Sequence, residues 1–461
     1  MTLSLFNTES RSIEAFKSIE ERKVGLYTCG PTVYHYAHIG NLRTYIFEDI
    51  LKRVLERRGY DVKHVMNVTD VGHLTDDADR GEDKMEVGAA REGKTVWDIA
   101  SHYTQAFETD LEKLNIKAPT VWCKATDHIS EQIEMVRVLE EKGFTYSLAD
   151  GVYFDTSKFS AYGKMAGLDL EGQMAGHRVE QTEGKRTPSD FCVWKSSPKG
   201  EKRLMEWESP WGTGFPGWHL ECSAMALKYL GEQFDIHCGG VDHVRVHHTN
   251  EIAQTEACTG KTWVNWWMHG EFLLMDEGKM SKSADNFLTI SLLEEQGFDP
   301  LAYRLYLMSA HYRKALTYHD EVLKGSQKAL ERLRGRAQEL EEGDGEVDAR
   351  HLKAFEEALD DDLNMPQAIS HMWMMLQDEN ISDPAKRATL LSMDEILCLD
   401  PFKIVKKEAI NDEAVLNLIK ERNAARNSKD FTRSDAIRDE LLAMDIVIKD
   451  SPEGTTFERK L

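Results

Sequence analysis

Several common features are missing from this sequence of 461 residues, and each absence excludes a class of protein. No run of about 18 apolar residues occurs, which excludes a membrane-spanning helix. The start of the chain lacks a cationic segment followed by an apolar run, so we expect no secretory signal. The 7 cysteines form no Cys-x-x-Cys pair, which favours reduced thiols in a cytoplasmic protein over a disulfide scaffold.

Positive charge is also scarce. The chain has 57 Lys and Arg against 80 Asp and Glu, which gives a net charge of −23. Such a protein does not coat nucleic acid by charge alone, although local basic patches remain compatible with a nucleic-acid partner. At about 100–200 residues per domain, the length predicts roughly three domains.

The pattern of apolar residues predicts a parallel sheet in the N-terminal part. Residues 24–29 form a β-prone run, residues 41–59 carry a helical stripe, and residues 62–68 are again strand-like. A strand, a helix and a strand in this order predict a βαβ unit. The chain then becomes less regular up to about residue 205 before strand-like runs resume, which is typical of an insertion into a sheet.

The C-terminal part is predicted to be largely helical. From about Asp320 the sequence is rich in Leu, Lys, Arg and Glu, and the last 50 residues form a small unit with a helix and two β-prone runs. The predicted sheet domain has two halves, residues 1–120 and 206–319, with an inserted domain at residues 121–205 between them. A helical bundle at residues 320–400 and a small mixed domain at residues 401–461 follow.

Residues 38–41, His-Ile-Gly-Asn, follow a predicted strand and open a predicted helix. The N–H groups at a helix start favour anions, Gly40 permits close approach, and His38 and Asn41 can donate to phosphate oxygens. By itself this segment is weak evidence, and it favours an ordinary histidine at a helix start over a phosphate site.

A second motif, Lys-Met-Ser-Lys-Ser at residues 279–283, follows a short predicted strand and a turn, so we expect an exposed loop. Its two lysines, Lys279 and Lys282, suit a triphosphate whose negative charge grows during displacement. Together and in this order, the two motifs resemble the signature pair of class I aminoacyl-tRNA synthetases, with Asn41 as a tolerated variant.

A competing phosphate motif occurs at residues 88–95, which fit the P-loop pattern. A P-loop needs a buried strand immediately before it, and residues 79–87 are too charged to form one. We predict instead that Thr95, with Asp98, caps the helix that follows.

Four further side chains are candidates for a metal site: Cys29, Cys222, His247 and Glu251. His247 and Glu251 are four residues apart and would share one face of a helix. Thiolates, imidazole and carboxylate are ligands of zinc. Spacing alone leaves open that the cysteines are core residues and that the His-x-x-x-Glu pattern is accidental.

A wider resemblance bears on this choice. The chain resembles cysteinyl-tRNA synthetases in residues 29–34, 216–225, 234–237 and 247–254, and further along in residues 185–195, 303–309, 360–364, 434–438 and 454–456. The resemblance covers nearly the whole chain. It implies an α/β fold, with a Rossmann-like parallel-sheet catalytic domain split by an inserted domain, then a helical bundle and a small anticodon-binding domain.

The resemblance also implies roles for single residues around the substrates. The family's zinc ligands match Cys29, Cys222, His247 and Glu251. Its amino-acid pocket matches Thr69, Trp218, His237 and Asp242. Its ATP-binding residues match His38, Gly40, Asn41, Lys279 and Lys282, of which His38, Asn41, Lys279 and Lys282 are expected to be catalytic. Its anticodon contacts match Arg426, Phe431, Asp435 and Asp450.

Zinc has a clear use in such a pocket. Serine differs from cysteine only by oxygen for sulfur, and a pocket that reads shape separates such near-isosteres poorly. Zinc prefers thiolate to a hydroxyl group and lowers the pKa of a thiol that binds it. The metal would therefore select the substrate, and we expect the bond from Glu251 to be the weakest.

The sequence departs from the family pattern near these residues. Cys238 replaces a glycine and adds a thiol, which is a minor candidate for a rival ligand, while Val246 and Thr249 replace a proline and a glutamate. These changes keep the four ligands but alter their surroundings. The segment 71–76 also differs from the family's acidic run.

The implied reaction has two steps. The cysteine carboxylate attacks the α-phosphate of ATP, which gives cysteinyl-adenylate and pyrophosphate, and a ribose hydroxyl of the terminal adenosine of tRNA(Cys) then takes the cysteinyl group. ATP implies Mg²⁺ as a second cofactor. We expect a cytoplasmic monomer with no membrane partner.

Two alternatives stay open at this point. One is a related ligase that joins cysteine to an amino sugar through the same adenylate, and it would need no anticodon unit. The other is a paralogue that binds RNA without catalysis, which the two intact phosphate motifs disfavour.

Overall fold

The computed structural model describes residues 2–72, 83–168, 184–198, 200, 203–275, 288–404, 413–444, 446–451 and 454–459. The chain divides into two compact units, Met1–Pro401 and Phe402–Leu461, and each is treated by itself. No helix among the described residues combines the length and apolar character needed to cross a membrane.

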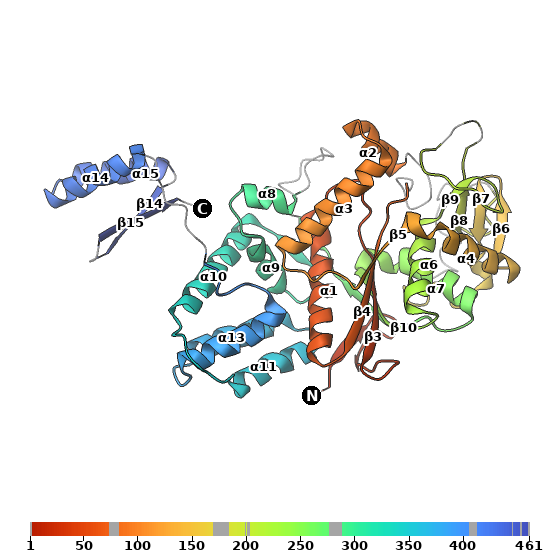
Figure 1. The fold of residues 1–461 in the computed structure, drawn as a ribbon, viewed down its shortest axis with the longest axis horizontal. Coiled ribbons are helices and arrows are strands. Elements are labelled where there is room, and N and C mark those ends of the chain that lie inside the picture. The colour runs from red at the N-terminus through yellow and green to blue at the C-terminus, as the bar shows by residue number, and fades with distance from the viewer. Residues whose placement is uncertain are drawn as a thin grey trace. The chain divides into compact units, whose positions relative to one another are not determined.

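A five-stranded sheet forms the centre of the first unit, in the order β11-β10-β3-β4-β5. Every neighbouring pair of its strands is parallel, which confirms the parallel sheet predicted from the sequence. Figure 1 shows α1 on one side of these strands and α6 on the other. The strands are β3 (Lys23–Thr28), β4 (Asp61–Val68), β5 (Val121–Lys124), β10 (Phe234–Gly240) and β11 (Val264–Gly270).

The loop after β3 leads into α1 (Ile39–Arg57), whose start is fixed by the His-Ile-Gly-Asn motif itself. The His38 ring accepts a hydrogen bond from the Asn41 backbone N–H at 3.2 Å, and the Asn41 side chain accepts one from the His38 N–H at 3.3 Å. This reciprocal capping box satisfies two backbone donors at the helix start. A Cβ at Gly40 would lie 3.0 Å from the His38 ring, which explains the glycine.

Two helices join β4 to β5: α2 (Lys84–Glu92) and α3 (Val96–Lys113). Thr95 caps α3 in a capping box with Asp98, as the sequence predicts. The segment that fits the P-loop pattern is thus the end of one helix and the start of the next, and a helix rather than a strand precedes its lysine.

A smaller antiparallel sheet lies between β5 and β10 in the chain, in the order β6-β7-β8-β9. Its strand β9 runs almost directly into the helix α6, so the two sheets share one continuous hydrophobic core. The elements of this region are α4 (Ile129–Glu141), β6 (Thr145–Leu148), β7 (Gly151–Phe154), β8 (Phe191–Ser196), β9 (Gly214–Pro216) and α6 (Trp218–Leu230). After β10, the short 3-10 helix η3 (Val241–Val244) and the helix α7 (His247–Thr259) lead to β11.

The rest of the first unit is mainly helical. A buried ion pair between Arg304 and Asp49, 2.7 Å apart, ties this part to α1. Its elements, with the N-terminal hairpin, are β1 (Ser4–Asn7), β2 (Ser12–Ala15), β12 (Leu273–Met275), α8 (Ile290–Glu295), α9 (Pro300–Met308), β13 (Leu316–Tyr318), α10 (Asp320–Glu339), α11 (Ala349–Asp360), α12 (Met365–Gln377) and α13 (Asp383–Leu397).

The second unit is small and mixed. Two helices pack over an antiparallel strand pair around a core that includes Val415, Ile419, Ile437 and Leu441. Its elements are α14 (Glu413–Asn427), α15 (Phe431–Ala443), β14 (Ile446–Ser451) and β15 (Gly454–Arg459). The finer domain boundaries expected from the sequence stay predictions.

Candidate metal centre and active site

The four predicted metal ligands lie together although they are far apart in the sequence. Cys29 directly follows β3, Cys222 lies in α6, and His247 and Glu251 occupy the first two turns of α7. All four are buried, and their ligand atoms lie within 4.8 Å of one another. The parallel sheet produces this meeting, because β3 leads to the first cysteine and β10 leads through η3 into α7.

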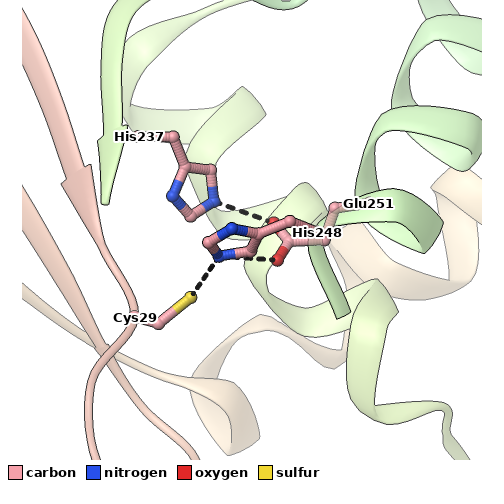
Figure 2. A group of neighbouring side chains, drawn as sticks. All are labelled: Cys29, His237, His248 and Glu251. Carbon is pink, nitrogen blue, oxygen red and sulfur yellow. Dashed lines mark hydrogen bonds and ion pairs between the residues drawn. The ribbon is translucent and has the colours of Figure 1, made fainter. Parts of the chain in front are cut away.

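A second donor set overlaps the first and is drawn in Figure 2. It keeps Cys29 and Glu251 but takes His237 and His248 in place of Cys222 and His247. The Nε2 atom of His237 lies 3.0 Å from one oxygen of Glu251, and the Nε2 atom of His248 lies 3.3 Å from the Cys29 sulfur. The sequence analysis did not predict His248 as a candidate ligand. The only signal for it in the sequence is that a second histidine directly follows His247.

The carboxylate of Glu251 is the charged centre of this cluster. Burial alone would raise its pKa, but the imidazoles of His237 and His247 lower the pKa of Glu251 to about 2. Burial likewise pushes the pKa of His247 down, yet Glu251 and the Cys222 sulfur raise it to about 10. Burial is compensated here by a close ion pair, in which His247 Nε2 and Glu251 lie 2.9 Å apart.

The two thiols are coupled as well. Burial and the neighbouring Cys222 sulfur raise the pKa of Cys29 well above its usual value. The hydrogen bond from Cys29 lowers the pKa of Cys222 despite its burial. The cluster thus offers thiolate, imidazole and carboxylate donors in a buried space, and this donor chemistry fits a transition-metal ion.

Further polar groups orient the donors. His269 contacts His248 at 2.8 Å, and Thr8 in turn contacts His269 at 2.8 Å. His219 contacts His247 with their Nδ1 atoms 2.9 Å apart. Such partners fix the ring orientation of metal-binding histidines. The buried Cys238, a rival ligand by sequence, belongs to neither donor set found among the described residues.

Two of the residues predicted to form the amino-acid pocket contact this cluster. The Trp218 ring centre lies 4.4 Å from that of His247, and His237 contacts Glu251 directly. Thr69 is buried, and its hydroxyl donates to Glu221 at 3.0 Å. Asp242 lies in η3 with a side chain that is 59% exposed, so its carboxylate is accessible to a ligand.

The predicted ATP-binding residues are described only in part. His38 and Asn41 stand at the start of α1, at the carboxyl end of β3, where parallel sheets bind ligands. Burial and the nearby His35 lower the pKa of His38, so its imidazole is neutral near pH 7. Lys279 and Lys282 lie outside the described residues.

The predicted anticodon residues lie in the second unit. Arg426 is in the last turn of α14, Phe431 begins α15 with 61% of its surface exposed, and Asp435 is exposed one turn later. The backbone of Asp450 lies in β14, and its side chain is outside the described part. The three described side chains are accessible to RNA bases.

Family models match most of the chain. The model of the tRNA synthetases class I (C) catalytic domain matches residues 15–328, a DALR domain matches residues 354–397, and the cysteinyl-tRNA ligase anticodon binding domain matches residues 412–457. The last of these matches falls in the second compact unit.

Named relatives agree with the family models. A cysteine–tRNA ligase 1 of Burkholderia lata is 50% identical over 456 residues, which are 98% of this chain and 96% of that protein. The cysteine–tRNA ligase of Treponema denticola is 44% identical over the full length of both chains.

Solved structures agree on the fold. The methionyl-tRNA synthetase of Mycobacterium tuberculosis matches with a TM-score of 0.56 at 16% identity, over 82% of this chain and 90% of that one. A leucyl-tRNA synthetase from Agrobacterium radiobacter matches with a TM-score of 0.56 at 11% identity, over 83% and 84%. These likenesses confirm the Rossmann-like fold predicted for the parallel sheet. The family models and the full-length relatives establish that the chain belongs to the cysteine–tRNA ligase family of class I aminoacyl-tRNA synthetases.

Proposed function

We propose that the chain activates L-cysteine with ATP and transfers it to tRNA(Cys). The cysteine carboxylate attacks the α-phosphorus, pyrophosphate leaves, and a ribose hydroxyl of the terminal adenosine then displaces AMP from cysteinyl-adenylate. The observation that carries this proposal is the buried group of two thiols, an imidazole and a carboxylate beside Trp218, in a chain with full-length relatives named cysteine–tRNA ligase.

We assign Cys29, Cys222, His247 and Glu251 as the ligands of one Zn²⁺ per chain. When bound, zinc supplies a preference for thiolate over hydroxyl, which separates cysteine from serine. This set is preferred to the set with His237 and His248 because it offers two sulfur ligands rather than one. Glu251 is the ligand best placed to loosen, since His237 already holds its other oxygen at 3.0 Å.

The remaining pocket residues orient the amino acid. Asp242 offers an accessible carboxylate for the substrate ammonium group, and Trp218 and Thr69 shield the space next to the metal ligands. His237 contributes from the middle of β10. These residues bind and position the substrate, because no general base is needed for attack by a carboxylate.

In the first step, the negative charge of the phosphates is stabilised by His38, Asn41, Lys279 and Lys282. Gly40 permits the phosphates to approach the backbone closely. Mg²⁺ accompanies ATP as its counter-ion. The neutral His38 imidazole acts as a hydrogen-bond donor rather than a cation, since burial lowers its pKa. Stabilisation of the phosphate charge and positioning of the reactants account for the acceleration of adenylate formation.

The second unit reads the anticodon of tRNA(Cys) through Arg426, Phe431, Asp435 and Asp450. A guanidinium group, an exposed ring and carboxylates suit stacking on and hydrogen bonding to unpaired bases. We further propose that the enzyme works as a monomer in the cytoplasm, where translation consumes its product. The amino-sugar alternative has no support among the relatives.

The proposal is tested by metal analysis combined with pyrophosphate exchange and aminoacylation. We expect about one zinc per chain, exchange that depends on cysteine and not on serine, and charging of tRNA(Cys) but not of an amino sugar. An active sample free of zinc, or one that activates serine as well as cysteine, would contradict it.

A further inference from the structure

Four rings gather at the surface just before the helix start that carries His38. Tyr36 and His35 lie in the loop between β3 and α1, and His102 and Tyr103 lie in α3. The ring centres of Tyr36 and Tyr103 are 4.9 Å apart, those of Tyr36 and His102 are 5.9 Å apart, and His35 stacks on Tyr103 at 5.9 Å. We call these four residues the ring platform.

One ring of the ring platform is buried and held by hydrogen bonds, and two others are exposed to solvent. Tyr103 is buried, and its hydroxyl is held by Arg91 at 3.1 Å and by Glu92. Tyr36 is 43% exposed, His102 is exposed, and the Tyr36 hydroxyl lies 3.2 Å from His102 Nε2. The exposed rings are therefore held in place before any ligand arrives, which reduces the entropy lost on binding.

The position of the ring platform links it to the proposed reaction. Tyr36 is two residues before His38 in the same loop. The helix α3 belongs to the connection from β4 to β5, and both of these strands lie on one side of β3 in the sheet. The half of the sheet formed by β10 and β11 lies on the other side of β3.

We propose that the ring platform stacks on the unpaired bases at the acceptor end of tRNA and guides that end to the adenylate. The proposal rests on the function proposed above. Tyrosine and histidine rings are common stacking partners of unpaired bases. A protein with a net charge of −23 has little general electrostatic attraction for RNA. A local stacking contact beside the reaction centre would therefore contribute binding free energy that the net charge does not provide. The second reaction step also requires a single-stranded end at this place.

The test uses the full-length enzyme and a tRNA(Cys) transcript with 2-aminopurine in place of the terminal adenine, whose fluorescence falls when the base stacks. Tyr36→Ala and His102→Ala remove one exposed ring each, and Tyr36→Phe is the matched control that keeps the ring. We expect both alanine variants to lose most of the quenching and to raise the KM for tRNA by about tenfold, while the phenylalanine variant behaves like the parent.

Pyrophosphate exchange separates this inference from the proposed function. The KM for ATP in exchange should change less than twofold in all three variants. Full quenching and an unchanged KM for tRNA in both alanine variants would overturn the inference, and a raised KM for ATP would assign the rings to the adenine of ATP instead. Absence of cysteine-dependent exchange in the parent enzyme would refute the proposed function itself.

Discussion

At the scale of single residues, Glu251 shows how the cluster tolerates charge without water. Each of its oxygens lies close to a different histidine, with His247 at 2.9 Å and His237 at 3.0 Å. A buried carboxylate is stable only when such partners offset its lost hydration. The same two contacts place Glu251 in both donor sets, so variants of the other ligands distinguish the sets.

The two donor sets make different predictions for zinc binding. Cys222→Ala removes a thiol from the proposed set and should weaken zinc binding by more than about 100-fold. Loss of a residue that only orients a ligand typically weakens metal binding by about 10- to 100-fold, so a larger effect indicates a direct ligand. His248→Ala leaves the two-thiol set whole and should retain about one zinc per chain. Elemental analysis after dialysis against a zinc chelator measures both. Cys258→Ala, outside both sets, is the control, and zinc loss in the His248 variant alone would favour the other set.

Glu48 gives a residue-scale prediction about pH. It is 1% exposed in α1, and within the described residues neither carboxyl oxygen has a hydrogen-bond partner. Burial raises the pKa of Glu48 well above its usual value of 4.5. The folded state therefore keeps a proton that the unfolded state releases, so this group lowers the stability progressively as the pH rises above the unfolded value.

Glu48→Gln cannot ionise and should remove this pH dependence. We expect the free energy of unfolding of the variant to increase relative to that of the parent as the pH rises from 5 to 8. This difference should grow by at most about 1.4 kcal/mol per pH unit. Urea denaturation at the two pH values measures the difference, with the exposed Glu339→Gln as control. A constant difference between variant and parent would show that Glu48 is ionised in the folded protein.

At the scale of elements, the buried guanidinium group of Arg304 helps to join the helical part of the first unit to α1. Arg304 in α9 contacts Asp49 of α1 at 2.7 Å and donates to the backbone carbonyls of Leu397 at 2.8 Å and Leu114 at 2.9 Å. Arginine suits this position because its planar donors reach three elements at once. Removing it leaves a buried carboxylate and two buried carbonyls with fewer partners.

Arg304→Met should accordingly destabilise the first unit by about 3 kcal/mol. Thermal or urea unfolding measures this loss, and the exposed Arg336→Met on α10 should change stability by less than about 0.5 kcal/mol. A loss below about 1 kcal/mol would mean that Arg53, which also pairs with Asp49 at 2.9 Å, compensates the missing charge.

At the scale of the whole molecule, the chain assigns cysteine activation and tRNA reading to different units. The metal cluster and the His-Ile-Gly-Asn motif belong to the first unit, and the proposed anticodon residues belong to the second. Phe431→Ala should therefore raise the KM for tRNA(Cys) by about tenfold and leave cysteine-dependent pyrophosphate exchange intact, because it removes one stacking face.

Aminoacylation and exchange assays on the full-length variant measure these two effects. The nearby Leu442→Ala, an exposed apolar residue of α15, is the matched control and should charge tRNA normally. An equal loss of both activities in the Phe431 variant would indicate damage to the fold rather than to tRNA reading.

Much of this architecture could be predicted because local patterns set it. The βαβ unit, the helix after residues 38–41 and the cap at Thr95 follow from side chains that are close in sequence. His248 and the ring platform could not be predicted in this way. His248 meets Cys29, which is 219 positions away in the sequence, and Tyr36 meets His102 of α3, which is 66 positions away.

The sequence by itself determined the donor types, the two phosphate motifs, the acidic balance and the family, because these are properties of residue identity and short spacing. The tertiary structure decided which donors meet, because only the order β10-β3-β4 brings the end of β3 beside η3 and α7. It also decided that Glu251 is shared by two sets of partners, since its carboxylate is buried away from bulk solvent and the packed imidazoles of His237 and His247 offset its charge.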